Sequence, residues 1–324
     1  MKFASALLNS HAMQSFLTDV RGGKLSHAYM LITPDKDVVD DFFKLMSCAI
    51  YCKNGICLSC LDCKRVMDGN NVNIKYIESE KGKQLGADVI KDMIDDTHIK
   101  AYEDGVKLYF IPYAETMTVQ AQNKLLKTLE EPSDNVTVVL GAGREGAMLD
   151  TVLSRVKKLY LDYFDTATIN SALRELYPSA DVSFAAVCAD GMLGRADKIA
   201  NDVDFKDLYD GIFDLLKTTK RSADVVKIYR SPLFAKEKIE DALNITELIM
   251  RDIIAVKSGS VDTVISVHKI DDIRELCNDF SIAAAAATSD FISECRDRLR
   301  FNCDEEAIAE RLLYKIQEVK FLCR

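Results

Sequence analysis

Short apolar runs alternate with stretches of helical periodicity over the first half of the chain. The runs have the length of buried strands, and they cover residues 28–32, 74–78, 106–111, 135–141 and 157–161. Between and before them, apolar residues recur at helical spacing, which predicts helices at 3–25, 37–52, 86–101 and 116–131. Strands that alternate with helices indicate an α/β domain whose mostly parallel sheet is covered on both faces.

From about residue 166 onward the pattern becomes helical throughout. Leu208, Ile212 and Leu215 share one helix face, as do Ile239 and Leu243 farther along. Bundled helices present faces of this kind. The second half is therefore predicted to hold one or two all-helical domains.

Composition narrows the class of protein. Of the 324 residues, 48% are hydrophobic and 29% charged, which is typical of a globular protein. The sequence lacks the ~20 apolar residues that a membrane span needs, and its beginning lacks the apolar core of a signal peptide, so we expect a cytoplasmic protein without membrane contact. The net charge of −9 argues against a free-standing nucleic-acid-binding protein.

Clustered cysteines are the first chemical feature. Cys57, Cys60 and Cys63 follow one another at intervals of three residues. Thiolates with this spacing converge on one zinc ion, and a fourth thiolate closes a tetrahedral structural site. From the residues alone, Cys48 and Cys52 both remain candidates for the fourth position.

A phosphate-binding loop is missing where an α/β ATPase would have one. Residues 33–41, TPDKDVVDD, follow the first strand and contain neither glycine nor a Gly-Lys-Thr sequence. Their four aspartates would repel a triphosphate. The third strand ends in Ile111-Pro112-Tyr113, without the acidic pair that holds Mg²⁺. These residues predict an ATPase-like domain that does not hydrolyse ATP.

Several motifs resemble those of the clamp-loader subunits of bacterial DNA polymerase III, which are AAA+ proteins. Residues 122–132, QNKLLKTLEEP, resemble their leucine-glutamate-proline helix, and residues 26–29, SHAY, resemble the entry to their first strand. Residues 153–156, LSRV, resemble their serine-arginine-cysteine motif, with Val156 in place of the cysteine. Spacings of nine, three and three match their zinc module at Cys48, Cys57, Cys60 and Cys63.

The resemblance implies a domain organisation. Residues 1–165 would form a degenerate AAA+ domain with a zinc module at 48–63, residues 166–205 a small helical lid, and residues 206–324 a helical collar. By the family spacing, Cys48 would be the fourth ligand of a structural zinc ion and Cys52 would be surplus. Because both nucleotide motifs are lost, the resemblance favours the delta-prime type over the gamma/tau type.

The resemblance also implies a function. A delta-prime-type subunit would be a non-catalytic stator in a five-subunit ring with gamma/tau ATPases and a delta subunit, which loads the sliding clamp on primed DNA. Arg155, with Ser154 as its motif neighbour, would reach into the ATP site of the next subunit as an arginine finger. The chain itself would bind no ATP, although its complex carries the polymerase name.

Two alternatives remain at this point. The first is a nucleotide-binding clamp-loader ATPase of the gamma/tau type with an atypical phosphate loop. The second is a zinc-dependent protein that binds nucleic acid by itself. Nucleotide titration tests the first, and a salt-dependent DNA shift tests the second.

Overall fold

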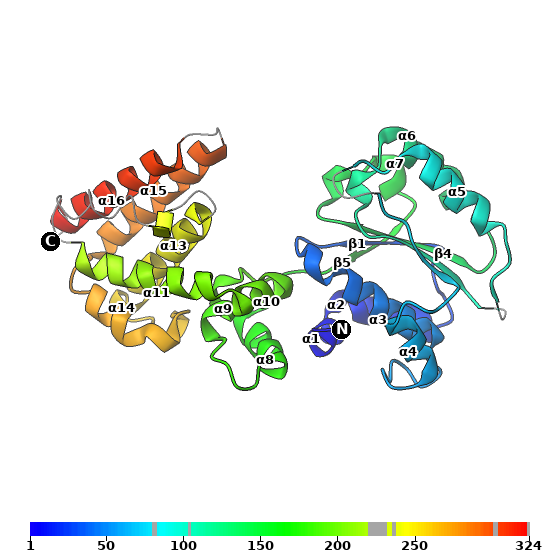
Figure 1. The fold of residues 1–324 in the computed structure, drawn as a ribbon, viewed down its shortest axis with the longest axis horizontal. Helices are drawn as coiled ribbons and strands as arrows, with labels where there is room; N and C mark the ends of the chain where they lie inside the picture. Colours follow the sequence, from blue (N-terminus) through cyan, green and yellow to red (C-terminus); the bar gives the residue numbers. More distant parts are fainter. Residues whose placement is uncertain (80–82, 103–104, 220–231, 235–237, 301–303, 323–324) are drawn as a thin grey trace. The chain divides into compact units, whose positions relative to one another are not determined.

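The computed structural model describes residues 1–79, 83–102, 105–219, 232–234, 238–300 and 304–322 (Figure 1). The chain divides into two compact units. One comprises Met1–Pro178 with Gly191–Arg195, and the other comprises Ser179–Asp190 with Ala196–Arg324.

The first unit is an α/β domain. Its strands are β1 (Ala28–Ile32), β2 (Ile74–Tyr76), β3 (Lys107–Ile111), β4 (Val136–Ala142) and β5 (Lys157–Tyr160). Its helices are α1 (Ala4–Asn9), α2 (His11–Arg21), α3 (Val39–Tyr51), α4 (Leu61–Met67), α5 (Ala87–Thr97), α6 (Val119–Glu130), α7 (Asp150–Leu153) and α8 (Thr166–Leu176).

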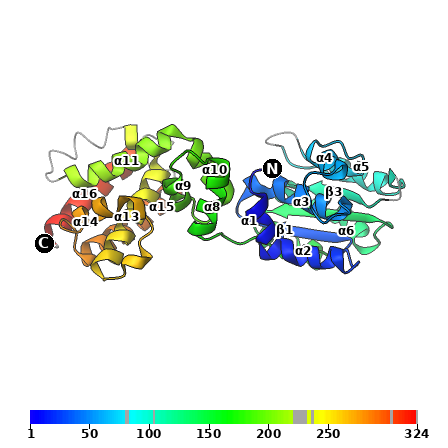
Figure 2. The same cartoon turned by 90° about the horizontal axis from the view of Figure 1, so that it is seen from below.

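The five strands form one sheet in the order β2-β3-β4-β1-β5, and every pair is parallel. Alternate side chains of each strand point to opposite faces. On one face Tyr29 packs edge-on against Phe16 of α2, and Phe110 stacks on Phe43 of α3. On the other face Met30 and Tyr109 join one core with buried residues of α5 and α6. These two helices lie on the side of the sheet opposite α2 and α3 (Figure 1; Figure 2 gives the view from below). The predicted α/β class, with helices on both faces, is confirmed.

Three predicted helices differ in their bounds. The helix predicted at 86–101 already ends at Thr97. The stretch 3–25 forms two helices because Ser10 takes an extended backbone and its hydroxyl caps the N-terminus of α2, accepting a hydrogen bond from the Met13 N–H. The helix predicted at 116–131 begins only at Val119, after Thr118, whose hydroxyl caps it in the same way. The sequence prediction missed α4, which lies inside the cysteine cluster.

Helices make up the second half, as the sequence predicts. They are α9 (Ser183–Cys188), α10 (Leu193–Asn201), α11 (Val203–Thr218), α13 (Ile239–Lys257), α14 (Ile270–Leu276), α15 (Ile282–Arg300) and α16 (Glu305–Leu322). The apolar face expected at 208–215 is buried, as is the face that includes Ile239 and Leu243. Inside this unit the carboxylate of Asp252 is fully buried and accepts hydrogen bonds from the backbone N–H groups of Ile265 and Ser266.

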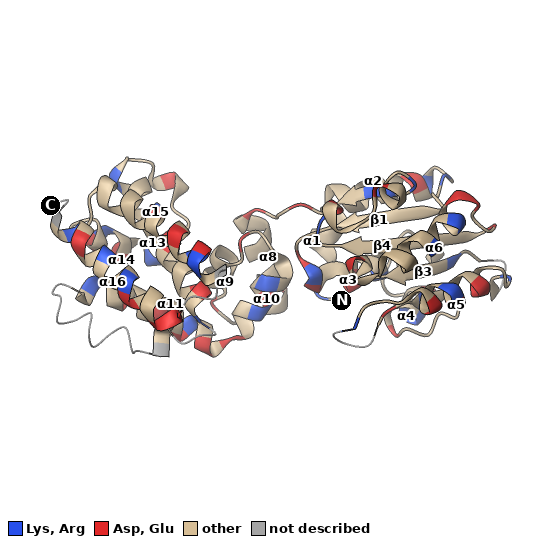
Figure 3. Cartoon of the chain, turned by 90° about the horizontal axis from the view of Figure 1, so that it is seen from above, with Lys and Arg blue, Asp and Glu red and all other residues tan. Residues whose placement is uncertain are grey.

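The division into two units does not isolate residues 166–205, since α8 belongs to the first unit and α9 to the second. The boundaries of lid and collar therefore stay predictions. Acidic and basic residues are interspersed along the helices of both units (Figure 3). Among the described residues, no helix is long and apolar enough to cross a membrane.

Candidate functional site

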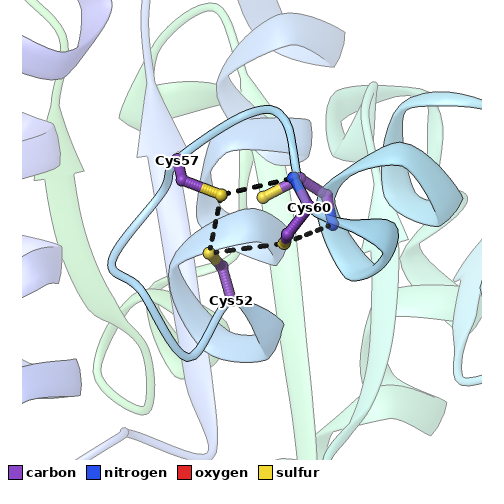
Figure 4. A group of neighbouring side chains, drawn as sticks. Cys52, Cys57 and Cys60 are labelled. Atoms are coloured by element: carbon purple, nitrogen blue, oxygen red, sulfur yellow. Dashed lines mark hydrogen bonds between the residues drawn. The ribbon is translucent and has the colours of Figure 1, made fainter.

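The thiols of Cys52, Cys57, Cys60 and Cys63 form a compact group, with all four Sγ atoms within 4.8 Å of one another. The Sγ atom of Cys52 lies 3.6 Å from that of Cys57 and 3.7 Å from that of Cys60 (Figure 4). A zinc ion bound by four sulfur atoms at about 2.3 Å would set them about 3.8 Å apart. The group therefore has the size of a tetrahedral metal site.

Two helix ends and the loop between them position these thiols. Cys52 is the residue at which α3 ends, and its extended backbone (ψ 113°) turns the chain away from the helix axis. Cys60 caps the N-terminus of α4, and its Sγ atom accepts a hydrogen bond from the Cys63 N–H at 3.5 Å. Cys57 lies in the intervening loop, with its Sγ atom 3.4 Å from the Cys60 nitrogen. The helix ends thus bring cysteines that are apart in the sequence into one group.

Cys48, the fourth ligand implied by the family spacing, lies beside this group and forms a side-chain hydrogen bond with Cys63, and its role as a ligand stays a prediction. Cys48 lies within α3, one turn before Cys52, and its side chain is fully buried. Burial in this apolar setting raises the pKa of the Cys48 thiol to about 11. The structure groups the other three predicted ligands with Cys52.

The loop of the group has features that suit a bound cation. Hydrogen bonds from Ser59 and from the Cys60 N–H lower the pKa of the Cys57 thiol to about 6, which favours the thiolate that binds metals. Ile56 and Leu58 have φ angles of 54° and 56°, in the left-handed region that costs non-glycine residues energy. Strain of this kind persists only where the surrounding structure fixes the backbone, and metal coordination would do so here.

The loop after β1 forms a hydrogen bond with the start of α10. The buried carboxylate of Asp35 accepts a hydrogen bond of 2.8 Å from the backbone N–H of Gly194, in the first turn of α10. A Cβ atom on Gly194 would lie 2.4 Å from the Cβ of Asp37 and 2.6 Å from Oδ1 of Asp35. Because these distances are below van der Waals contact, Asp35 and Asp37 pack directly against Gly194, and no atom fits between them at this point.

A cavity of about 480 Å³ lies beside this loop, at the carboxyl edge of the sheet. In α/β sheets this edge is the usual place for a ligand. Here the ammonium of Lys36 lies 2.6 Å from the carboxylate of Glu115, so this cation of the cavity is paired within the chain. The cavity is lined by Pro34, Lys36, Glu115, Gly143, Arg144 and Ala147.

Arg155 lies in the turn between α7 and β5, and about a third of its side chain is exposed. Its Nη1 atom donates hydrogen bonds to the Thr151 carbonyl at 2.7 Å and to the Ser154 hydroxyl at 3.1 Å. Its Nη2 atom lies 2.6 Å from a carboxylate oxygen of Glu130, the last residue of α6. The partner of Glu130 thus comes from outside its own helix.

Comparison with known proteins finds relatives among the subunits of DNA polymerase III. The family model described as "DNA polymerase III, delta subunit" matches residues 8–165. The delta' subunit of DNA polymerase III from Bacillus subtilis is 24% identical over 319 residues, which are 96% of this chain and 97% of the relative. The delta' subunit from Yersinia pestis is 35% identical over 112 residues, 34% of this chain and 33% of the relative. The Escherichia coli tau subunit is 24% identical over 54% of this chain and 27% of its own length.

Among solved structures, a DNA polymerase III gamma subunit-related protein from Thermotoga maritima aligns over 94% of this chain and 99% of its own, with 18% identity and a TM-score of 0.41. The match to the delta' subunit from Bacillus subtilis extends along nearly the whole length of both chains. The chain is therefore similar to delta' subunits of bacterial DNA polymerase III along nearly its whole length, and its residues 8–165 match the model of that family.

Proposed function

We propose that this chain is a non-hydrolysing subunit of a clamp-loader ring, in which neighbouring tau-type subunits hydrolyse ATP to place a sliding clamp on primed DNA. The chain would act as a stator, with a delta-type subunit as a further partner. Within it, residues 166–205 and 206–324 would serve as lid and collar.

The hydrogen bond from Gly194 to Asp35 is the observation that carries the non-hydrolysing role. Phosphates bind where backbone N–H groups converge, usually in a glycine-rich loop or at a helix N-terminus. In this chain a carboxylate of the chain itself accepts the N–H of Gly194, at the N-terminal turn of α10. The loop after β1, residues 33–41, contains no glycine. This arrangement supports a domain that keeps the α/β framework and does not take up a nucleotide.

Arg155 would act on the ATP of the adjacent subunit. Its position on the surface and its three hydrogen-bonding partners support this role, because the guanidinium is partly exposed yet held in one orientation. A guanidinium placed against the phosphates of ATP stabilises the charge that develops in phosphoryl transfer. Ser154 would contribute by orienting the guanidinium rather than by touching the nucleotide.

A structural zinc ion would be held by Cys52, Cys57, Cys60 and Cys63. Four thiolates leave no open coordination position, so the ion would fasten the loop between α3 and α4 and would not take part in a reaction. The sulfur–sulfur distances support this assignment.

Calorimetric titration of the purified chain with Mg²⁺-ATP tests the non-hydrolysing role. We expect no heat of binding, while the tau-type subunit of the same organism gives a saturable signal under the same conditions. Micromolar binding by this chain would refute the proposal and favour the nucleotide-binding alternative.

Substitution of Arg155 tests the arginine finger in the reconstituted ring. Because a finger is worth ~10³–10⁵ in rate at the site that it serves, Arg155→Ala should lower the DNA-stimulated ATPase kcat by roughly 10-fold or more. Arg155→Lys should restore little, since lysine lacks the planar fork of donors. Arg174→Ala, which changes an exposed arginine of α8, is the matched control. Full activity of the Arg155→Ala ring would exclude the finger.

A further inference from the structure

Glu130 and Arg155 come from different elements and meet at the surface of the α/β unit. Glu130 ends α6, and Arg155 follows α7. The ion pair has a separation of 2.6 Å, and the side chains of Glu130 and Arg155 are 50% and 33% exposed. Exposed pairs of this kind contribute little to folding stability. Folding stability alone therefore does not explain why this ion pair is present.

The backbone at Glu130 and at Arg155 is anchored by neighbouring residues that are buried in the core. Val152 and Val156 flank Arg155 in the sequence, and both side chains are buried in the same core as Leu125 and Leu129 of α6. Val156 replaces the cysteine of the family motif, and its burial fills that place in the core. The distance between the end of α6 and the turn of Arg155 is thus set by packing, which keeps the two side chains within reach of each other.

The pair leaves part of the guanidinium available. Arginine has five N–H donors in a planar fork, and the structure assigns Nη1 to Thr151 and Ser154 and one contact of Nη2 to Glu130. Donors remain for a phosphate oxygen. An arginine side chain loses considerable rotamer freedom when it becomes ordered. A side chain that is already ordered does not lose this freedom again when it contacts a ligand.

We propose that Glu130 is a positioning residue for the in-trans action of Arg155, holding the guanidinium in the orientation in which it meets the phosphates of the neighbouring subunit. This inference rests on the proposed role of Arg155. The carboxylate acts as a hydrogen-bond acceptor of fixed position. The negative charge of Glu130 is not required for this role. It would even repel the triphosphate that Arg155 meets. Glutamine, which keeps an acceptor oxygen at the same place, should therefore serve.

Steady-state ATPase kinetics of the reconstituted ring, with clamp and primed DNA present, test the proposal. Glu130→Ala should lower kcat by roughly 10-fold with an unchanged KM for ATP, because misplacement of a catalytic group affects the transition state more than binding. Glu130→Gln should stay within about threefold of the wild type. Asp134→Ala is the control, since this exposed residue forms no ion pair among the described residues. Thermal unfolding of each isolated variant checks the fold.

Double substitution separates positioning from other effects. If Glu130 acts only through Arg155, Glu130→Ala combined with Arg155→Ala should be no slower than Arg155→Ala alone. A further loss in the double variant, or wild-type or faster turnover with Glu130→Ala, would overturn the proposal while leaving the arginine finger in place. An Arg155→Ala ring with full activity would instead overturn the proposed function itself, and the role of Glu130 with it.

Discussion

Cys48 and Cys52 lie one helical turn apart at the end of α3, and only Cys52 belongs to the group with the other three cysteines. We expect Cys52→Ser to lose bound zinc and Cys48→Ser to keep the zinc content of the wild type, because a ligand must reach the centre that the other thiols surround. Metal analysis of the purified variants by atomic emission measures this directly.

Chelator-induced unfolding provides the second readout for the cysteines. A strong chelator should lower the unfolding midpoint of the wild type and of Cys48→Ser, since metal binding contributes to folding free energy. It should leave Cys52→Ser unchanged, because that variant has no ion to lose. Zinc loss from Cys48→Ser together with zinc retention by Cys52→Ser would restore the ligand set that the family spacing implies.

Asp96 at the end of α5 is the centre of a charged cluster. Its carboxylate lies 2.7 Å from the ammonium of Lys75 and 3.0 Å from that of Lys107, and it accepts a hydrogen bond from Tyr109. Burial alone would raise its pKa, but hydrogen bonds from Lys75, Tyr109 and Lys107 outweigh burial and lower the pKa to about 2. Since the unfolded value is about 3.9, Asp96→Asn should reduce the free energy of unfolding at pH 7 by about 2 kcal/mol.

The pH dependence of this effect has a definite sign. A lowered folded-state pKa contributes stability above the unfolded pKa, and the contribution disappears as pH falls through the folded value. Urea unfolding of the wild type and Asp96→Asn should therefore differ at pH 7 and converge between about pH 4 and pH 2. Asp95→Asn, a change at the exposed neighbour, should have little effect at any pH. A constant difference between wild type and Asp96→Asn across this range would contradict the assignment.

At the scale of elements, the first turn of α10 packs closely against the loop after β1 at Gly194. The Gly194 N–H is bonded to Asp35, and a Cβ atom on Gly194 would overlap Asp35 and Asp37. Gly194→Ala should push the first turn of α10 away from the loop and reduce the free energy of unfolding by ~1–3 kcal/mol, the usual effect of overpacking. Chemical denaturation of the isolated chain measures the loss.

Gly146→Ala is the matched control for this contact. A Cβ atom on Gly146 would meet nothing within 4 Å, and its φ angle lies outside the left-handed region. This change should be neutral or slightly stabilising, because alanine restricts the unfolded chain. Equal stability of Gly194→Ala and Gly146→Ala would show that the loop and α10 can separate at no cost.

For the molecule as a whole, charge limits what the chain can do alone. The net charge is −9, and basic residues are interspersed with acidic ones on both units (Figure 3). We expect the isolated chain not to shift primed DNA in a gel at physiological salt, since binding to phosphates requires a local excess of positive charge. Retention of the same DNA by the assembled ring is the positive control. A shift by the isolated chain that weakens steeply with added salt would contradict this expectation.

The architecture followed from the sequence because its signals are local. Apolar runs of strand length placed the strands of the sheet, and their alternation with helical segments implied the parallel arrangement that the structure contains. The boundaries were less predictable, because Ser10 and Thr118 end or start helices through single side-chain hydrogen bonds that interrupt a continuous apolar pattern.

The sequence by itself determined the missing phosphate loop, the cysteine cluster and the motif that contains Arg155, because each depends on which residues are present in a short stretch. Only the tertiary structure shows three contacts. The Cys52 thiol lies with those of Cys57, Cys60 and Cys63. The Gly194 N–H donates a hydrogen bond to Asp35, and Glu130 forms an ion pair with Arg155. These three contacts depend on where helices end and on how they pack. The spacing of the residues along the chain does not reveal that they lie close together in space.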